Sequence, residues 1–329
     1  MKNPGADDAE RAALAAMAAR PWVAQSRLGA QDLVVLLRGL PQISLSSAFD
    51  LDWDPALPPA ERAERTVASL GRLREARLIS GPVARLRADS PDITDPRLDS
   101  SLTPFGALWW AAAGRPSVAV EVTAWDLDLV RHGWFAARGD VVVGLVRGRA
   151  VDHAGTAPAP VPLIELDPIE LSIDTMTGLV DLVADLWPDG ADADPDLPAA
   201  TLGLVDSEAF LLALAAGDTA VVDAVVGRAD LDEWPIALRG LEFGVLGGVD
   251  VTVVARPGSP APHRSTGHWI LGSDGWRGLS VALTGTAGSA QDIAHGAQVR
   301  VTGQSLTTMR RALVLALATA LGQNPPSDS

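Results

Sequence analysis

The feature that most constrains this chain is a series of four predicted strands followed by a helix, which occurs twice in the sequence. The first copy consists of strands predicted at residues 118–122, 134–137, 141–146 and 163–166, followed by a helix from Thr175. The second consists of strands predicted at residues 251–255, 268–271, 279–283 and 298–301, followed by a helix from Ser305. Matching positions lie 133 to 135 residues apart, so the register hardly drifts. This repetition predicts two similar halves that share one core.

The strands of this repeated unit show the two-residue period that is typical of one buried face. Val118, Val120 and Val122 alternate with Ala119 and Glu121. Each copy also contains a Gly-Asp or Asp-Gly turn signal between two strands, which indicates a hairpin. Outside the repeats, apolar stripes at helical spacing predict helices at residues 31–40, 60–78, 102–113, 207–216 and 219–226. Consecutive antiparallel strands with helices outside them predict an α+β fold.

The domain organisation follows from one internal boundary. Residues 189–198 are acidic, contain proline and are rich in turn-forming residues, so they separate an N-terminal half, 26–190, from a C-terminal half, 191–322. We expect residues 1–25 to be a flexible N-terminal segment and residues 323–329 to be a disordered tail. The two halves are predicted to form one compact unit.

Composition excludes several classes of function. The net charge of −15 argues against nucleic acid as a partner, because phosphate binding needs clustered Lys or Arg. The absence of Cys excludes disulfides, thiolate chemistry and the zinc sites that depend on Cys. Hydrophobic residues make up 47% of the chain, which is enough to bury a sizeable core.

The longest apolar run, residues 312–321, is far shorter than the ~20 residues that span a bilayer. It therefore predicts a buried helix and no membrane insertion. Asp7, Asp8 and Glu10 stand where a secretory signal would need a basic start and an apolar core. The expected location is the cytoplasm.

Recognised catalytic and metal-binding patterns are missing from the sequence. None of the five histidines forms the H-E-x-x-H zinc motif, and no G-x-S-x-G elbow, P-loop or G-x-G-x-x-G loop occurs. We therefore predict no cofactor, no metal and no enzymatic activity. The residues of a Ser-His-Asp triad need only meet in space, so a hydrolase or small-molecule enzyme stays the alternative. That alternative predicts a deep pocket with a carboxylate beside His153, His263 or His268.

An acidic loop imitates the start of a calcium-binding EF-hand at Asp192, Asp194 and Asp196. A calcium loop needs Gly at its sixth position and Glu at its twelfth, where this chain has Leu197 and Gly203. The interpretation is a solvated linker.

Several segments of the chain resemble the EspG family, the cytosolic chaperones of type VII (ESX) secretion in actinobacteria. The closing order of Asp274-Gly275-Trp276, a strand and a Leu-rich helix is similar to that family, and the resemblance extends over most of residues 28–321. The other matching segments are 33–41 (LVVLLRGLP), an Arg/Glu-rich helix that ends in 76–79 (ARLI), 114–116 (GRP), 130–140 (VRHGWFAARGD) and 163–166.

The resemblance implies a central antiparallel β-sheet flanked by helical bundles, with two halves related by a pseudo-two-fold axis. It also implies a task, because EspG proteins bind the tip of helical PE-PPE heterodimers, keep them soluble and deliver them for secretion. The expected partner is a secreted helical protein, PE-PPE-like or WXG100-like. Pairing of the chain with itself, as a homodimer, is a further possibility.

The expected contact surface follows from tryptophan usage, since the chain has ten Trp, five Phe and no Tyr. Tryptophan is enriched in interfaces because it buries a large area and keeps a polar N–H. The pair Trp109-Trp110 falls in a predicted helix and is assigned to the core. The predicted partner-binding residues belong to the second hairpin and the final helix: Trp269, Trp276, Arg277, Met309, Arg310 and Arg311.

Overall fold

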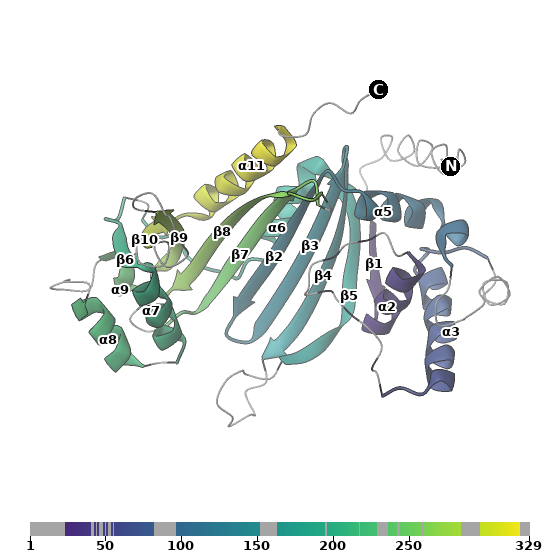
Figure 1. Ribbon diagram of the computed structural model, residues 1–329, viewed down its shortest axis with the longest axis horizontal. Helices are drawn as coiled ribbons and strands as arrows, with labels where there is room; N and C mark the ends of the chain where they lie inside the picture. The colour runs from purple at the N-terminus through teal and green to yellow at the C-terminus, as the bar shows by residue number, and fades with distance from the viewer. Residues whose placement is uncertain are drawn as a thin grey trace.

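The computed structural model describes one chain with a long twisted sheet at its centre (Figure 1). The expected tail, 323–329, and all but the last two residues of the expected flexible segment, 1–25, lie outside the described residues. The described residues are 24–322, with gaps at 41–42, 44, 46–48, 50, 52–53, 55, 82–96, 152–162, 195, 217, 229–235, 242–243, 258 and 284–296.

Ten strands form the sheet, and every neighbouring pair is antiparallel. Their order is β1-β5-β4-β3-β2-β7-β8-β9-β10-β6, so β2 and β7 meet in the middle. The strands of the N-terminal side are β1 (Ala24–Leu28), β2 (Val118–Asp126), β3 (Leu129–Arg138), β4 (Val141–Val151) and β5 (Leu163–Thr175). Those of the C-terminal side are β6 (Ala200–Gly203), β7 (Gly247–Ala255), β8 (His263–Gly272), β9 (Gly275–Leu283) and β10 (Ala297–Gln304).

The predicted strands are confirmed, and each extends beyond the residues that were predicted for it. Both turn signals form tight hairpins, with Arg138 opposite Val141 and Gly272 opposite Gly275. Gly139 has φ 61°, a left-handed conformation that glycine adopts without strain. The sequence patterns missed the two outermost strands, β1 and β6, because they have only five and four residues.

The helices begin where the sequence supplies suitable first residues. Pro59 and Pro104 occupy the first turns of α3 (Pro59–Glu75) and α5 (Pro104–Gly114), where no N–H donor is needed. The Thr103 hydroxyl accepts a 3.0 Å hydrogen bond from the Gly106 N–H and so caps α5. The predicted helix from Thr175 is shorter than expected and starts with the 3₁₀ turn η3 (Met176–Gly178). The α-helices are α2 (Ala30–Gly39), α3 (Pro59–Glu75), α5 (Pro104–Gly114), α6 (Leu179–Ala184), α7 (Leu204–Ala216), α8 (Thr219–Arg228), α9 (Ile236–Arg239) and α11 (Leu306–Gly322).

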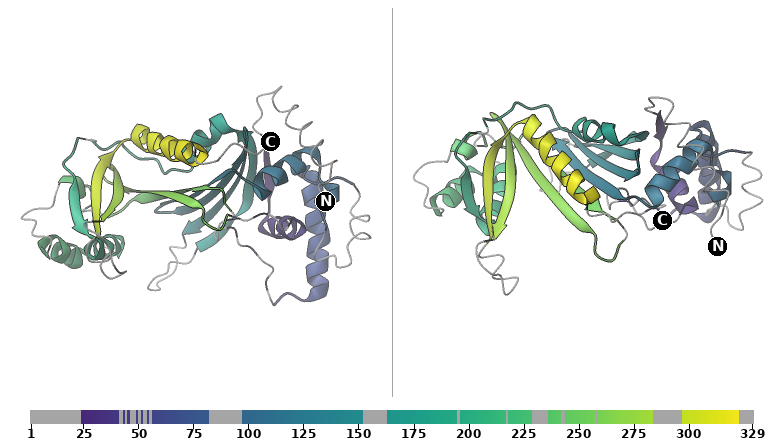
Figure 2. Two further views of the ribbon diagram at one scale, coloured as in Figure 1. Left: turned by 45° about the horizontal axis from the view of Figure 1, so that its top comes forward. Right: turned by 90° about the horizontal axis from the view of Figure 1, so that it is seen from above.

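One face of the sheet is covered at its centre by α6 and α11 (Figure 2). Apolar side chains of the central strands, such as Val120 and Val253, belong to one core with side chains of these two helices. The helices contribute Leu179, Val183 and Leu313 to this core. Because side chains alternate along a strand, the remaining residues of the same strands face the other way.

Among the residues that the structure describes, the helices on the opposite face lie at its two ends. At one end, α2, α3 and α5 pack on β1, β3, β4 and β5, and at the other, α7, α8 and α9 pack on β6, β8 and β10. Neighbouring residues of one strand point to opposite faces of the sheet. Trp134 packs with α2, α3 and α5, whereas Phe135 packs in the central core under α6 and α11. Likewise Ile270 joins the other end core, and Trp269 the central one. We call these two end layers the N-terminal and C-terminal helix groups.

Helix α11 differs from the prediction of a buried helix. Its inner side is buried through Met309, Leu313 and Leu317, whereas Val314 and Leu315 on its outer side are 48% and 58% exposed. Among the helices that the structure describes, none has the length and the apolar stretch that crossing a membrane would take.

Candidate partner-binding face

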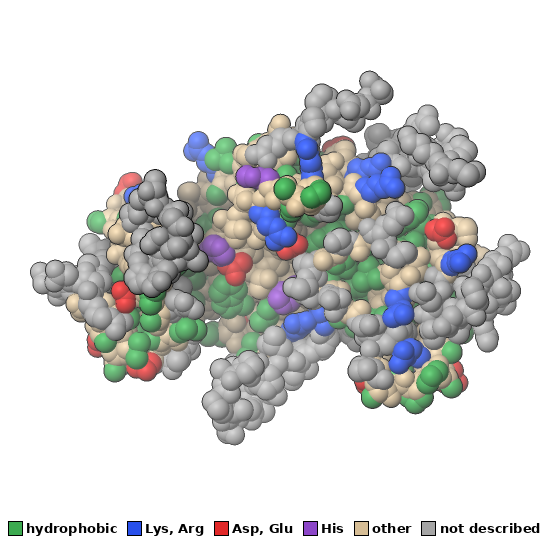
Figure 3. Space-filling view, in the orientation of Figure 1, with side chains coloured by type: hydrophobic (Ala, Val, Ile, Leu, Met, Phe, Trp, Pro, Cys, Tyr) green, Lys and Arg blue, Asp and Glu red, His purple; other side chains and the backbone are tan. Residues whose placement is uncertain are grey.

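Within the described structure, a strip of the sheet lies uncovered between the two helix groups, on the face that they share. Its side chains belong to β2, β3, β7 and β8 and are mostly polar. Figure 3 shows acidic, basic and histidine side chains close together over this middle part of the molecule. We call this strip the polar floor, and its members are Glu121, Thr123, His132, Asp250, Thr252, Thr266 and His268.

The strand register sets four of these residues in one row across the sheet. Thr123 lies opposite both His132 on β3 and Asp250 on β7, and Asp250 lies opposite His268 on β8. The Thr123 hydroxyl is 3.2 Å from His132 Nδ1, and Asp250 Oδ1 is 2.6 Å from His268 Nδ1. Directly opposite polar side chains stabilise a sheet modestly and fix each other's orientation.

A second row runs beside the first. Glu121 lies opposite Thr252, which lies opposite Thr266, and the two threonine hydroxyls are 3.3 Å apart. Thr266 is exposed, while Glu121 and Thr252 are partly buried. The polar floor therefore offers both donors and acceptors over four adjacent strands.

The ion pair of the polar floor changes the titration of His268. Its hydrogen bond to Asp250 raises the pKa of the imidazole, and the negative charge of Asp250 adds to this, while partial burial works in the opposite direction. Both side chains are nearly half exposed, at 48% and 44%, so solvent screens the pair.

This pair also bears on the hydrolase alternative, which expects a histidine beside a carboxylate. His268 meets that expectation, but a triad also needs a hydroxyl at Nε2, and the structure records no hydrogen bond to that atom from the residues it describes. His263 is exposed at the start of β8, and His153 lies outside the described residues. Within the described part of the chain, no three His, Cys, Asp or Glu side chains are grouped so that they could hold a metal ion.

One end of the polar floor is apolar. The Trp125 ring lies against Gly248, where an added Cβ would be 2.2 Å from the indole. Nearby in the sheet, Leu127 follows β2 and Leu246 precedes β7, and they are 59% and 37% exposed. The uncovered face thus combines hydrogen-bonding groups with an aliphatic and aromatic edge, as protein interfaces do.

The structure places the six residues predicted to bind a partner in two different environments. Trp276, Arg277 and Met309 are fully buried, and Trp269 is only 7% exposed. These four side chains therefore have almost no surface to offer a partner directly. Arg310 and Arg311 are exposed on α11, where Arg310 Nη1 is 2.9 Å from Asp181 Oδ1 of α6.

The burial of Gly275 and Trp276 has a specific cause in the acidic segment that was predicted to separate the halves. The Trp276 N–H donates to the Ala191 carbonyl, and a Cβ on Gly275 would lie 2.7 Å from that oxygen. Asp192 accepts a 2.7 Å hydrogen bond from the Leu306 N–H and so caps α11. Ala191 and Asp192 are exposed, as a solvated linker would be, but the prediction missed that they also cover the turn and hold the final helix.

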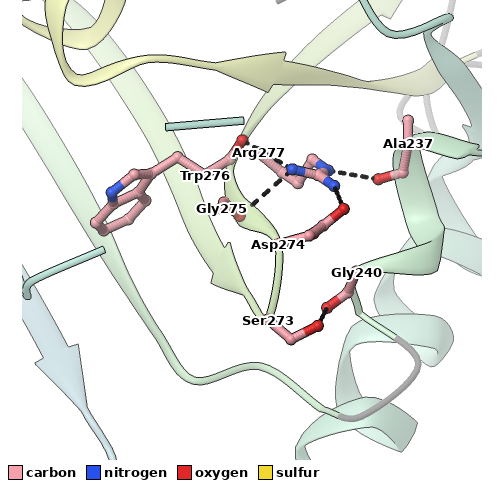
Figure 4. A network of polar contacts seen from close by, with 7 residues as sticks. All are labelled: Ala237, Gly240, Ser273, Asp274, Gly275, Trp276 and Arg277. Carbon is pink, nitrogen blue, oxygen red and sulfur yellow. Dashed lines mark hydrogen bonds and ion pairs between the residues drawn. The ribbon is translucent and has the colours of Figure 1, made fainter. Parts of the chain in front are cut away.

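Arg277 is the buried centre of a hydrogen-bond network that ties the sheet to α9 (Figure 4). Its Nε donates to the Ala237 carbonyl at 2.7 Å, and its Nη2 donates to Asp274 Oδ2 at 2.6 Å. Ser273 adds a 3.1 Å hydrogen bond from its hydroxyl to the Gly240 carbonyl. Arg277 therefore positions the C-terminal helix group beside the polar floor.

Sequence reasoning missed the polar floor. The alternation of strand β2 already separated Glu121 and Thr123 from the buried valines, so a polar face could have been inferred from it. The sequence did not reveal that β2 pairs with β7, because this pairing joins segments far apart in the chain.

The comparisons with known proteins give a structural match. No family model matches the chain, and no curated protein matches it in sequence. Among solved structures, the chain is similar to the type VII secretion system chaperone EspG5 of Mycobacterium tuberculosis, solved in complex with a PE25-PPE41 dimer. The TM-score is 0.54 at 11% sequence identity, and the match covers 93% of this chain and 98% of that chain. At this identity the similarity establishes the fold, which confirms the resemblance to EspG at that level.

Proposed function

We propose that this protein is a cytosolic chaperone-like binding protein that recognises a helical type VII secretion substrate and keeps it soluble for export. The observation that carries the proposal is the fold match to EspG5, which extends over nearly the whole of both chains. The matched protein was solved with a PE25-PPE41 dimer, so the partner proposed here is a secreted helical protein, PE-PPE-like or WXG100-like.

The proposed contact surface is the polar floor with its apolar end. It is flanked by two helix groups, and it offers hydrogen-bonding side chains beside exposed Leu127 and Leu246. Such a surface suits the end of a helical protein, where unpaired backbone groups need polar partners and apolar side chains need cover. Binding a helical partner in this way requires no covalent chemistry, which agrees with the proposed non-enzymatic role.

The two halves are proposed to be related by a pseudo-two-fold axis between β2 and β7. The strand order supports this, because β3, β4 and β5 follow outward on one side as β8, β9 and β10 do on the other. Each series ends in a helix on the same face, α6 or α11. In this proposal the buried Trp269, Trp276, Arg277 and Met309 hold the C-terminal half of the contact surface in place.

The test is co-expression with secreted helical proteins encoded beside the gene, followed by size-exclusion chromatography. We expect one of them to co-elute and to be soluble only in the presence of this protein. Replacing Thr266→Arg, on the polar floor, should weaken binding at least tenfold, because it places a long charged side chain in the contact surface.

The matched control is Thr201→Arg, which changes an exposed threonine on the outermost strand β6. This variant should bind as the unaltered protein does. Absence of any co-eluting partner would overturn the proposed function, and equal binding by both variants would overturn the proposed contact surface.

A further inference from the structure

Helix α11 has an outer side that nothing in the described structure covers. From Ala312 to Leu321 the helix contains no charged residue, and Thr319 is its only polar side chain. A helix that is apolar on all sides is normally buried on all sides. Here the inner side is buried, while Val314, Leu315 and Leu321 are 48%, 58% and 38% exposed.

These three aliphatic residues belong to one line of exposed positions along the helix. The line also contains Arg311, Ala318 and Gly322, and steps of three or four positions place its members on one face, opposite the side that packs on the sheet. We call this line the α11 stripe, and it consists of Arg311, Val314, Leu315, Ala318, Leu321 and Gly322. Exposed aliphatic residues that are contiguous, and not scattered singly, mark an interaction surface.

We propose that the α11 stripe packs against the α11 stripe of a second copy of this chain, with the two helices antiparallel. A two-fold interface brings the same surface of each copy together, so a self-complementary line of aliphatic side chains fits it. The small residues Ala318 and Gly322 allow the two helices to approach closely.

Charge favours the antiparallel arrangement over the parallel one. The basic side chains of the helix, Arg310 and Arg311, are both near its N-terminal end. An antiparallel partner places them near the C-terminal end of the other helix, which carries a partial negative charge. A parallel partner would instead bring the four arginines of the two copies together.

The size of the surface sets the expected strength of the dimer. Seventeen residues of helix extend about 25 Å at ~1.5 Å per residue, and one such pair buries less than the ~800 Å² per partner of a standard interface. Helix α6 lies beside α11 and is joined to it by Arg310 and Asp181, so its partly exposed Val180 and Leu182 would add area. We therefore expect a dimer that dissociates on the order of micromolar concentrations.

This inference goes beyond the proposed function, because the α11 stripe and the polar floor are on opposite faces of the sheet. Dimerisation would leave both polar floors free. Its test needs no secreted partner, so it can fail while the proposed function stands.

The first experiment is sedimentation of the full-length protein between about 1 and 100 µM, a range that brackets the expected dissociation constant. We expect a monomer–dimer equilibrium that Leu315→Arg weakens at least tenfold. The matched control is Leu212→Arg on α7, where the original side chain is similarly exposed at 65% and which should leave the equilibrium unchanged. Circular dichroism checks that both variants fold.

The second experiment uses the absence of cysteine from the chain. A single Ala318→Cys substitution should give a disulfide-linked dimer on mild oxidation, because this position lies near the middle of the antiparallel pair. A Leu212→Cys variant should not. A wild-type protein that stays monomeric up to 100 µM, or a dimer that survives Leu315→Arg, would overturn the proposal, as would binding of α11 to lipid vesicles without self-association.

Discussion

The two helix groups lie on the same face of one sheet, and each has an ion pair with one buried partner, but the buried partner is an acid in one group and a base in the other. In the N-terminal group, the buried partner is the carboxylate of Asp32, 2% exposed, and its partner Arg72 is 48% exposed. In the C-terminal group, the buried partner is the guanidinium of Arg277, 0% exposed, and its partner Asp274 is 48% exposed.

Each buried charge is placed where backbone groups of opposite polarity are available. Asp32 accepts a 3.0 Å hydrogen bond from the Gly29 N–H at the start of α2, while Arg277 donates to carbonyls that include that of Ala237. The two pairs also join different elements, because Asp32 and Arg72 join α2 to α3, whereas Arg277 joins β9 to α9. Each half satisfies a buried charge with the local backbone that it has.

The largest effect is expected from Arg277→Ala, which removes a fully buried side chain and leaves the Ala237 carbonyl without its donor. We expect the free energy of unfolding to fall by about 4 kcal/mol. Chemical denaturation measures it, with Arg264→Ala, an exposed arginine on β8, as a control that should change little. A loss below about 1 kcal/mol would show that this network does not anchor the C-terminal group.

A smaller effect is expected from Arg72→Ala, which leaves the buried carboxylate of Asp32 without its cation. The free energy of unfolding should fall by about 3 kcal/mol. Arg65→Ala is the matched control, because its pair with Glu61 is exposed on the same helix and should be worth less than about 0.5 kcal/mol. Adding Asp32→Asn to Arg72→Ala should recover part of the loss, and no recovery would contradict the role assigned to the buried charge.

The smallest effect concerns the half-exposed pair between the two groups, His268 and Asp250. Because the folded state raises the pKa of His268, the pair's stabilisation is fully present below the unfolded pKa of ~6.5 and is lost as pH rises through the folded pKa. Solvent screening limits the change to roughly 0.5 kcal/mol. NMR titration of His268 should show a lower pKa in Asp250→Asn, and an unchanged pKa would refute the assigned cause.

Local signals predicted much of this fold, but not the contacts between distant segments. The alternation around Val120, the turns at Gly139 and Asp274, and the Ser305 boundary of α11 are encoded within a few residues, and the structure confirms the elements they predict. The polar floor was not predicted, because it exists only once β2 pairs with β7. The burial of Trp276 and Arg277 was not foreseen either, because the hydrogen bond between Trp276 and Ala191 also joins segments far apart in the chain.

The central pairing of β2 with β7 has a consequence for how the protein is made. One hundred and twenty residues separate Asp126 from Gly247, so at ~5–20 residues per second the ribosome needs on the order of ten seconds to supply the second strand. During that interval β2 presents open backbone donors and acceptors that could recruit another nascent chain. Glu121, a charged side chain in the middle of this strand, is suited to discourage such pairing until the correct strand emerges.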